Sequence, residues 1–399
     1  MDAKEKSRLE AVNRRNAISE LLNGDEELAI RLKSVRNFAA TVRVSEYHLT
    51  NACNIRCQGC WFFEYGHDQK TKEVKSIADL EAFIEGEKAR RVTTALLIGG
   101  EPTLVQDRVR AFVRGLKYVT ISSNGLKKLP YTEEFANVAV MLTLFGGGKL
   151  DDELRATKPG GKRFAGLFDK ALENYRDDDR ACFIYALTER GLDYIEDTVR
   201  RIAENGNKVT FNFYSEYNTD SPIKLQYETR LLEEALRVKA LYPETVISHP
   251  THIRGIITGQ THWGTFGYHS CPSVSVHHPA HKDRLANGNP TLPFFNTYNA
   301  DFKTVEFCCT SGHCEGCRDS QAVYSWLMVN MDRHLTSKES LREWVDIAEC
   351  YWAQFKWSPY HHARRAPAVA VAVAAAKQVR FADGLRAARE HTDSMIPAA

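Results

Sequence analysis

Residues 51–63, NACNIRCQGCWFF, place Cys53, Cys57 and Cys60 in the spacing C-x3-C-x2-C. Three thiolates this close in sequence can converge on one soft metal centre. A structural zinc site normally has four protein ligands, so three cysteines without a nearby fourth favour a [4Fe–4S] cluster with one iron open to another molecule. Among ten cysteines, chance gives roughly 0.006 such spacings. The sequence therefore predicts a reactive iron–sulfur site in this loop.

The cysteine spacing resembles the signature of the radical S-adenosylmethionine (SAM) superfamily. The resemblance implies that the open iron binds SAM, and that the reduced cluster cleaves SAM to a 5′-deoxyadenosyl radical, which takes a hydrogen atom from a substrate. It also implies flavodoxin or ferredoxin as the electron donor. Relatives usually carry an aromatic residue just before the third cysteine, where this chain has Gly59. Trp61 or Phe62 is therefore expected to stack on the adenine.

A glycine turn follows the buried apolar run 93–98 (TTALLI), about forty residues after the cysteine motif. Glycines let a backbone approach a ligand closely, and a proline fixes the turn that follows. The turn resembles the second motif of the superfamily, which contacts the amino group of SAM. The residues expected to bind SAM here are Gly99, Gly100, Glu101 and Pro102.

The next strand, 118–122, ends in Ser123-Asn124-Gly125. The resemblance places Ser123 and Asn124 near the ribose and methionine of SAM, and an ordinary Asn-Gly turn explains the string equally well. Many relatives have an acidic residue near the end of the following strand, 138–145, where this chain has Thr143 and Phe145.

Strands and helices alternate between residues 42 and 214. Expected strands are 42–49, 93–98, 118–122, 138–145, 182–187 and 209–214, and expected helices are 77–88, 108–116, 164–175, 193–205 and 227–242. This alternation predicts right-handed βαβ crossovers and a parallel sheet. The expected fold is α/β, a partial (β/α)6 TIM-like barrel that resembles the core of the superfamily. All three motifs then lie at the C-terminal ends of strands, where such barrels carry their sites.

Four regions are expected along the chain. Residues 1–40 form a helical segment broken near Asn23–Gly24, 41–248 the barrel, 249–335 an auxiliary-cluster region and 336–399 C-terminal helices and a tail. Within the third region, 249–309 is rich in Gly, Pro, Asn and His and has little periodicity, so it is expected to be irregular. Within the fourth, 337–355 is expected to be an amphipathic helix that packs on the core.

A second cysteine group lies in the irregular region. It resembles the twitch and SPASM extensions of radical SAM enzymes, which hold auxiliary [4Fe–4S] clusters. The expected ligands are Cys271, Cys309, Cys314 and Cys317, with Cys308 competing for the place of Cys309. Structural zinc is the rival interpretation, with Cys271 or His313 completing the set of donors.

The charge and composition of the whole chain exclude several classes of protein. A net charge of +2 from 53 basic and 51 acidic residues gives no global field for nucleic acid. The longest apolar run, 366–376, is about half of the ~20 residues that span a bilayer. The charged N-terminus lacks the apolar core of a signal peptide, and ten cysteines favour metal ligation in a reducing compartment. We expect a cytoplasmic protein without nucleic-acid or membrane partners.

The expected function is that of a radical SAM enzyme. We expect it to oxidise or rearrange a small polar metabolite, such as a sugar, an aminocyclitol or an amino-acid derivative, with help from the auxiliary cluster. Modification of a ribosomally made peptide is the alternative, and a zinc-stabilised binding protein is a remote one. Candidate substrate contacts are His67, Arg155, His252, Arg254, His262, Trp263, Tyr268 and His269, all in expected loops or segments that follow strands.

Overall fold

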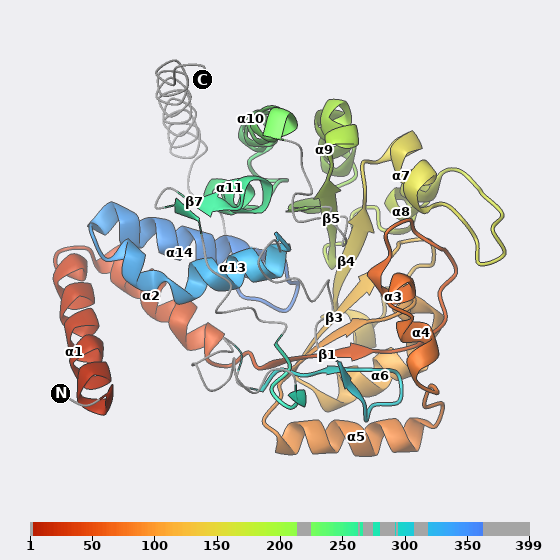
Figure 1. Ribbon diagram of the computed structural model, residues 1–399, viewed down its shortest axis with the longest axis horizontal. Coiled ribbons are helices and arrows are strands. Elements are labelled where there is room, and N and C mark those ends of the chain that lie inside the picture. The colour runs from red at the N-terminus through yellow and green to blue at the C-terminus, as the bar shows by residue number, and fades with distance from the viewer. Residues whose placement is uncertain are drawn as a thin grey trace, which may run out of the picture.

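Six parallel strands form the frame of the molecule, and they are neighbours in the sheet in the order in which they occur in the chain (Figure 1). They are β1 (Val44–His48), β2 (Thr94–Ile98), β3 (Tyr118–Ser123), β4 (Ala139–Leu144), β5 (Ala181–Leu187) and β6 (Lys208–Phe213). The structure is a computed structural model, and it describes residues 3–213, 225–261, 264–265, 274–279, 292, 294–306 and 318–361. The expected α/β fold with a parallel sheet is confirmed.

Helices connect the strands and cover the outer face of the sheet (Figure 1). They are α5 (Ile77–Ala89), α6 (Gln106–Gly115), α7 (Gly148–Arg155), α8 (Leu167–Asn174), α9 (Ile195–Glu204) and α10 (Leu225–Leu241). Leu97, Ile121 and Phe183 from the outer face of the strands lie in one core with Phe112 and Ile202 from the helices. Successive side chains of a strand point to opposite faces of the sheet. The alternate residues therefore face the inside of the barrel, where they can line a binding site.

The inner face of the sheet lines a single cavity of about 400 Å³. Every one of the six strands contributes inward-facing residues, such as Glu46 from β1, Thr120 and Ser122 from β3 and Asn212 from β6. Since β1 and β6 are not paired with each other, the sheet is open, as a partial barrel requires.

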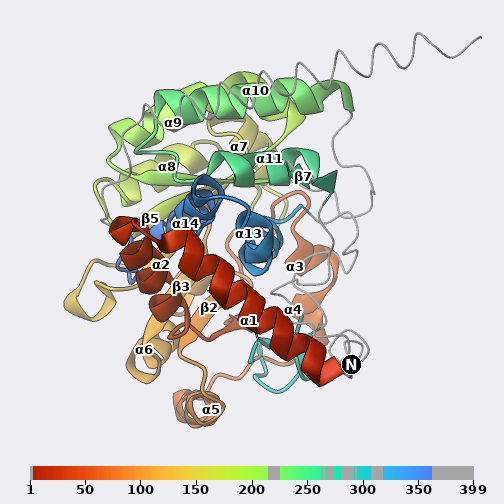
Figure 2. The ribbon, with the colours of Figure 1, turned by 90° about the vertical axis from the view of Figure 1, so that its left-hand side faces the viewer.

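A terminal helix pair closes the end of the barrel at which the strands begin. Helix α1 (Ala3–Leu22) leads into α2 (Glu26–Ala39), which packs against α14 (Lys338–Ala353), and Figure 2 shows α2 beside α14. Arg31 of α2 donates to Glu349 of α14 at 2.6 Å and 3.0 Å. The expected helix over 337–355 is therefore present, and it joins the two ends of the described chain.

Aromatic side chains from the last turn of α14 and the segment after it pack into the barrel, and we call Trp352, Phe355, Trp357 and Tyr360 the aromatic plug. The plug packs with Tyr118, Ala139 and Cys182 from the first residues of β3, β4 and β5. The indole Nε1 of Trp357 donates to the Thr120 hydroxyl at 3.0 Å, inside the sheet. The plug thus packs against the strand starts, and Trp352, Phe355 and Trp357 also line the cavity.

The expectation of irregular structure over 249–309 is wrong in part. Helix α11 (Pro250–Thr258) begins at the cap His249, whose side chain accepts from Thr251, and ends at Gly259 with φ +67°. Seven of its nine residues are buried, so it is apolar on most sides and shows no helical periodicity. Strand β9 (Thr297–Tyr298) pairs with β1, and β10 (Val305–Glu306) pairs with β9.

Several short elements complete the described chain. They are α3 (Trp61–Glu64), α4 (His67–Lys70), α13 (Ser320–Val329), the hairpin strands β7 (Gln260–Thr261) and β8 (Gly264–Thr265), and the 3₁₀ turns Pro102–Leu104, Glu133–Phe135, Glu189–Tyr194 and Met331–His334. The expected auxiliary ligands Cys271, Cys308, Cys309, Cys314 and Cys317 lie outside the described residues, and so does the apolar run 366–376.

Candidate active site

The cysteine loop follows β1 at the C-terminal end of the sheet. Cys53, Cys57 and Cys60 are free thiols, partly buried, and all three line the cavity. Burial raises the pKa of the Cys53 thiol to about 12 and that of Cys60 to about 11. Thiols held this way stay protonated until a strong positive charge enters the loop, and a bound metal centre is such a charge.

The spacing of these thiols bears on the kind of metal centre. Over the residues that the structure describes, no three His, Cys, Asp or Glu side chains form a group that could hold a single metal ion. A zinc ion with three thiolates needs sulfurs roughly 3.8 Å apart, from Zn–S bonds of about 2.3 Å in a tetrahedron. In a four-iron cube each thiolate binds a different iron, so the sulfurs stand further apart.

The glycine turn after β2 is bound directly to the cysteine loop. The amide of Gly100 donates to the carbonyl of Thr50 at 2.8 Å, and the amide of Glu101 donates to the carbonyl of Ala52 at 2.8 Å. A Cβ on Gly100 would lie 2.0 Å from that Ala52 oxygen, so only glycine fits there. Gly99, Gly100 and Glu101 line the cavity.

The Glu101 carboxylate holds the next turn rather than standing free. Its side chain accepts from the Thr103 amide and hydroxyl at 3.0 and 2.7 Å, from the Ser123 hydroxyl at 2.9 Å and from the Asn124 amide at 2.8 Å. The residue is only 1% exposed. Burial raises the pKa of Glu101, while these donors act in the opposite direction. Pro102, expected beside SAM, is buried in the 3₁₀ turn that follows.

Asn124 completes a connection among the three motifs. Its side-chain amide donates to Asn54 at 2.7 Å and lies 3.9 Å from the sulfur of Cys53. Ser123 and Asn124 line the cavity together with Cys53. The turns after β1, β2 and β3 therefore form one hydrogen-bonded unit around a shared space.

Two aromatic side chains follow the third cysteine. Trp61 and Phe62 both line the cavity, and their rings lie 5.8 Å apart in an edge-to-face contact. His48 of β1 packs 5.5 Å from Trp61 and 5.2 Å from Phe62. Burial lowers the pKa of His48 to about 3, so the imidazole is neutral at physiological pH. The loop thus presents an uncharged aromatic surface to the cavity.

Arg155 is a candidate contact that the structure brings to the cysteine loop. It is 2% exposed, lines the cavity, pairs with Asp151 at 3.2 Å and donates to the carbonyl of Thr143. Burial opposes its charge, but Asp151 and Cys57 hold the pKa of Arg155 above its ordinary value. Asp151 also accepts from the amide of Phe145 at 2.6 Å. An acidic residue therefore does lie near the end of β4, supplied by α7.

The other candidate contacts have different surroundings. His67 is buried beside Glu306, and His252 stacks on Tyr324 at 3.7 Å with Ser320 at 3.0 Å from its Nε2. These two histidines and Arg254 are not among the residues that line the cavity. His262, Trp263, Tyr268 and His269 lie outside the described residues.

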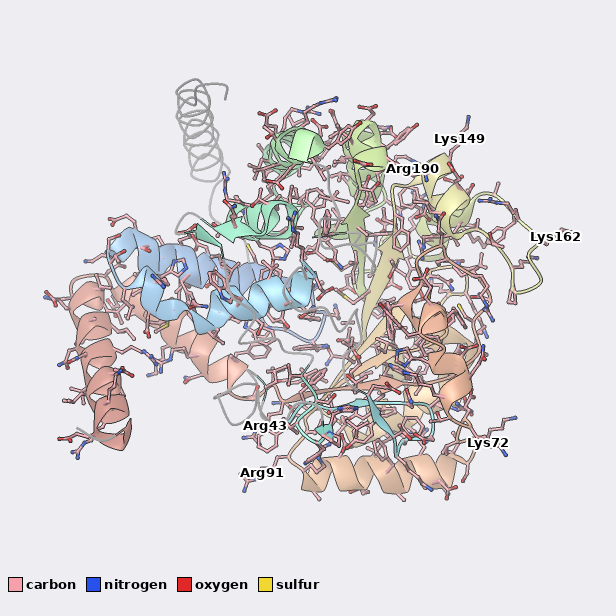
Figure 3. All side chains as sticks on the ribbon, in the orientation of Figure 1. Arg43, Lys72, Arg91, Lys149, Lys162 and Arg190 are labelled. Atoms are coloured by element: carbon pink, nitrogen blue, oxygen red, sulfur yellow. The ribbon has the colours of Figure 1, made fainter. Side chains whose placement is uncertain are left out.

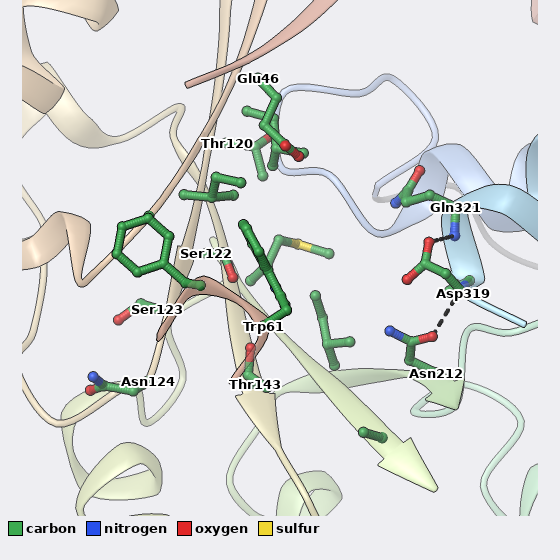
Figure 4. Close-up of a pocket in the computed structure, with 18 of the residues that line it drawn as sticks. Glu46, Trp61, Thr120, Ser122, Ser123, Asn124, Thr143, Asn212, Asp319 and Gln321 are labelled. Carbon is green, nitrogen blue, oxygen red and sulfur yellow. Dashed lines mark hydrogen bonds between the residues drawn. The ribbon is translucent and has the colours of Figure 1, made fainter. Parts of the chain in front are cut away.

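The sequence did not single out a polar wall opposite the SAM motifs. Figure 4 shows Asn212, Asp319 and Gln321 on one side of the cavity and Ser123 and Asn124 on the other, with Trp61 between them. Asn212 lies in an expected strand, and period-two alternation could have identified it as inward-facing. Asp319 caps α13, an element that was not expected, so no sequence signal pointed to it.

Basic side chains on the surface project from separate parts of the molecule. Figure 3 labels six of them, with Arg43 and Arg91 at one end of the sheet, Lys149, Lys162 and Arg190 around α7, and Lys72 beyond α4. Within the described residues, no helix has both the length and the apolar composition of a membrane span.

Comparison with solved structures finds similarity in fold. Native anSMEcpe with bound AdoMet is 14% identical, with a TM-score of 0.44 over 66% of this chain and 74% of that chain. Streptococcus suis SuiB bound to precursor peptide SuiA is 17% identical, with a TM-score of 0.39 over 57% of this chain and 53% of that chain. HydG, a maturase of the [FeFe]-hydrogenase, is 13% identical, with a TM-score of 0.32 over 55% and 56%. No family model and no curated protein matches the chain.

Proposed function

We propose that this chain is a radical SAM enzyme. Cys53, Cys57 and Cys60 would hold a [4Fe–4S] cluster, and the cavity beside them would hold SAM. When bound, these groups supply a 5′-deoxyadenosyl radical that removes a hydrogen atom from a substrate. The proposal rests on one observation above all, the hydrogen-bonded unit that joins the cysteine loop, the glycine turn and the Ser-Asn-Gly turn around one cavity.

Different residues of the cavity would bind different parts of SAM. The backbone of Gly99 and Gly100 borders the cavity where a ligand can approach closely, and Glu101 holds that turn against the next one. Trp61 offers a ring for the adenine, and Ser123 and Asn124 offer hydroxyl and amide groups for the ribose and methionine. The aromatic plug excludes water from the end of the barrel opposite the cysteine loop, as radical chemistry requires.

We propose a small polar metabolite as the substrate. A cavity of about 400 Å³ has the size of small-molecule sites, and the wall of Asn212, Asp319 and Gln321 provides polar groups opposite the SAM motifs. Cys271, Cys309, Cys314 and Cys317 would hold an auxiliary cluster, which would supply an electron acceptor for an oxidation, and a flavodoxin or ferredoxin would be the external reductant. Modification of a peptide is the alternative, and it makes a precursor peptide the substrate.

The test is reconstitution of the full chain with iron and sulfide under anaerobic conditions. After reduction with dithionite in the presence of SAM, we expect 5′-deoxyadenosine, and an EPR signal of a reduced [4Fe–4S] cluster that changes when SAM is added. Replacing Cys53, Cys57 and Cys60 together by Ala should abolish both. Cys350→Ala is the matched control, because Cys350 lies in α14 and does not line the cavity. Product formation by the triple variant, or bound zinc without iron in the wild type, would refute the proposal.

A further inference from the structure

The polar wall opposite the SAM motifs is dominated by one carboxylate. Asp319 caps α13, and its side chain accepts from the backbone amides of Gln321 at 2.9 Å and Ala322 at 3.4 Å. Asn212 also contacts it, and holds the next residue by accepting from the Ser320 amide at 2.9 Å. Figure 4 shows the carboxylate turned toward the cavity, between Asn212 and Gln321. All of these contacts are with neutral groups.

The cations that line the cavity are already paired elsewhere. Arg318 donates to the carbonyl of Ile257 and lies 3.7 Å from Glu228. Arg155 is paired with Asp151 at 3.2 Å. No side-chain cation of the described residues forms a salt bridge with Asp319. A second carboxylate, that of Glu46, also lines the cavity. A carboxylate enclosed this way gains from a cation supplied by a ligand, because an enclosed charge without a counter-charge is costly.

Trp352 is another residue that lines the cavity. The indole Nε1 of Trp352 is buried and has no hydrogen-bond partner among the described residues, and Trp352 is 7% exposed and lines the cavity. A buried N–H group normally has an acceptor. The residues that line the cavity therefore include a carboxylate without a counter-charge and a tryptophan whose buried N–H group has no acceptor among the described residues.

We propose that Asp319 binds an ammonium group of the substrate, so that the substrate is an amine. This inference rests on the proposed function and narrows it. Among small polar metabolites it selects amino sugars, aminocyclitols and amines derived from amino acids over neutral sugars. The ammonium would be held at the α13 end of the cavity, across from Ser123 and Asn124.

Three small probes of similar size test the charge preference. Butylammonium, 1-butanol and butyrate are titrated against the anaerobically reconstituted full chain with SAM, with binding followed by ligand-observed NMR. We expect butylammonium to bind about tenfold more tightly than 1-butanol, and butyrate to bind most weakly. Asp319→Asn removes the charge but keeps a good helix cap, and should equalise butylammonium and 1-butanol.

Asp107→Asn is the matched control, since Asp107 is an exposed residue in the first turn of α6, and it should keep the tenfold preference. Equal binding of the ammonium and the alcohol by the wild type, no binding of the ammonium, or a preference that persists in Asp319→Asn would overturn the inference. Formation of 5′-deoxyadenosine by the wild type is measured in parallel. Its presence with no ammonium preference refutes the amine site alone, and its absence refutes the proposed function.

Discussion

The carboxylate of Glu101 accepts a hydrogen bond from the backbone amide of Asn124 at 2.8 Å, so the turn after β2 fixes the turn after β3. This contact is one of four that the side chain makes with buried donors. The two motifs are thus one structural unit, although 23 residues separate them in the chain.

Replacing Glu101 by Ala should disrupt this unit. Four buried donors would lose their acceptor, and we expect a loss of about 3 kcal/mol in the free energy of unfolding and at least a tenfold loss in SAM affinity. Urea denaturation and equilibrium dialysis with SAM measure the two effects. Glu81→Ala, on the exposed side of α5, should change neither. Unchanged SAM affinity in a destabilised Glu101→Ala protein would show that the unit serves folding alone.

Two glycines that differ in their surroundings give a second prediction. Gly100→Ala places a methyl group 2.0 Å from the Ala52 carbonyl and should cost about 3 kcal/mol of stability and lower the iron content after reconstitution. Gly86 lies inside α5 with no atom within 4 Å of an added Cβ, so Gly86→Ala should gain about 0.5–1 kcal/mol. Thermal unfolding and iron analysis measure both. Equal effects of the two substitutions would contradict this account of the glycine turn.

The buried imidazole of His252 should make stability depend on pH. Burial lowers the pKa of His252 to about 3, so below the ordinary value of about 6.5 the unfolded chain binds a proton that the folded chain does not. Stability should therefore fall with decreasing pH, by about 1.4 kcal/mol per pH unit for this one group. His252→Phe keeps a ring against Tyr324 and should reduce that slope between pH 6 and 5 in chemical denaturation. At pH 8 the slopes of variant and wild type should coincide. Parallel curves at pH 5–6 would show that the imidazole titrates normally.

The aromatic plug allows two tryptophans to be compared. Trp357 donates to Thr120, whereas the N–H of Trp352 has no partner among the described residues. Both substitutions to Phe lose some packing, but Trp357→Phe also loses a buried hydrogen bond and should cost about 1 kcal/mol more. Urea denaturation of the two variants gives this difference. A larger loss in Trp352→Phe would mean that its indole N–H is satisfied in the folded protein.

Local pattern was sufficient to predict most of the frame. Strands β1 to β6 lie where apolar β-rich runs predicted them, because a parallel sheet covered by helices needs continuous apolar strands. Helix α7 was not expected: it has only eight residues, and it begins at the last of three consecutive glycines. Helix α11 was not predicted because most of its residues are buried, so its sequence lacks the alternation of apolar and polar faces.

The candidate site was predictable where its residues are close in sequence. Cys53, Cys57 and Cys60, the glycine turn and Ser123-Asn124 each form a short string, and the sheet places their strand ends side by side. Asp319 and Trp352 reach the cavity only through the packing of α13 and α14, which lie more than a hundred residues beyond β6. No local sequence pattern predicts that these two side chains lie at the cavity.

The aromatic plug has a consequence for the order of events during synthesis. Trp357 and Tyr360 are among the last residues of the described chain, yet they pack against the first residues of β3, β4 and β5. A ribosome delivers the strands long before it delivers the plug, and domains assemble as their residues emerge. The first residues of β3, β4 and β5 therefore lack these packing partners until residues 352–360 have been synthesised, and this part of the core forms last.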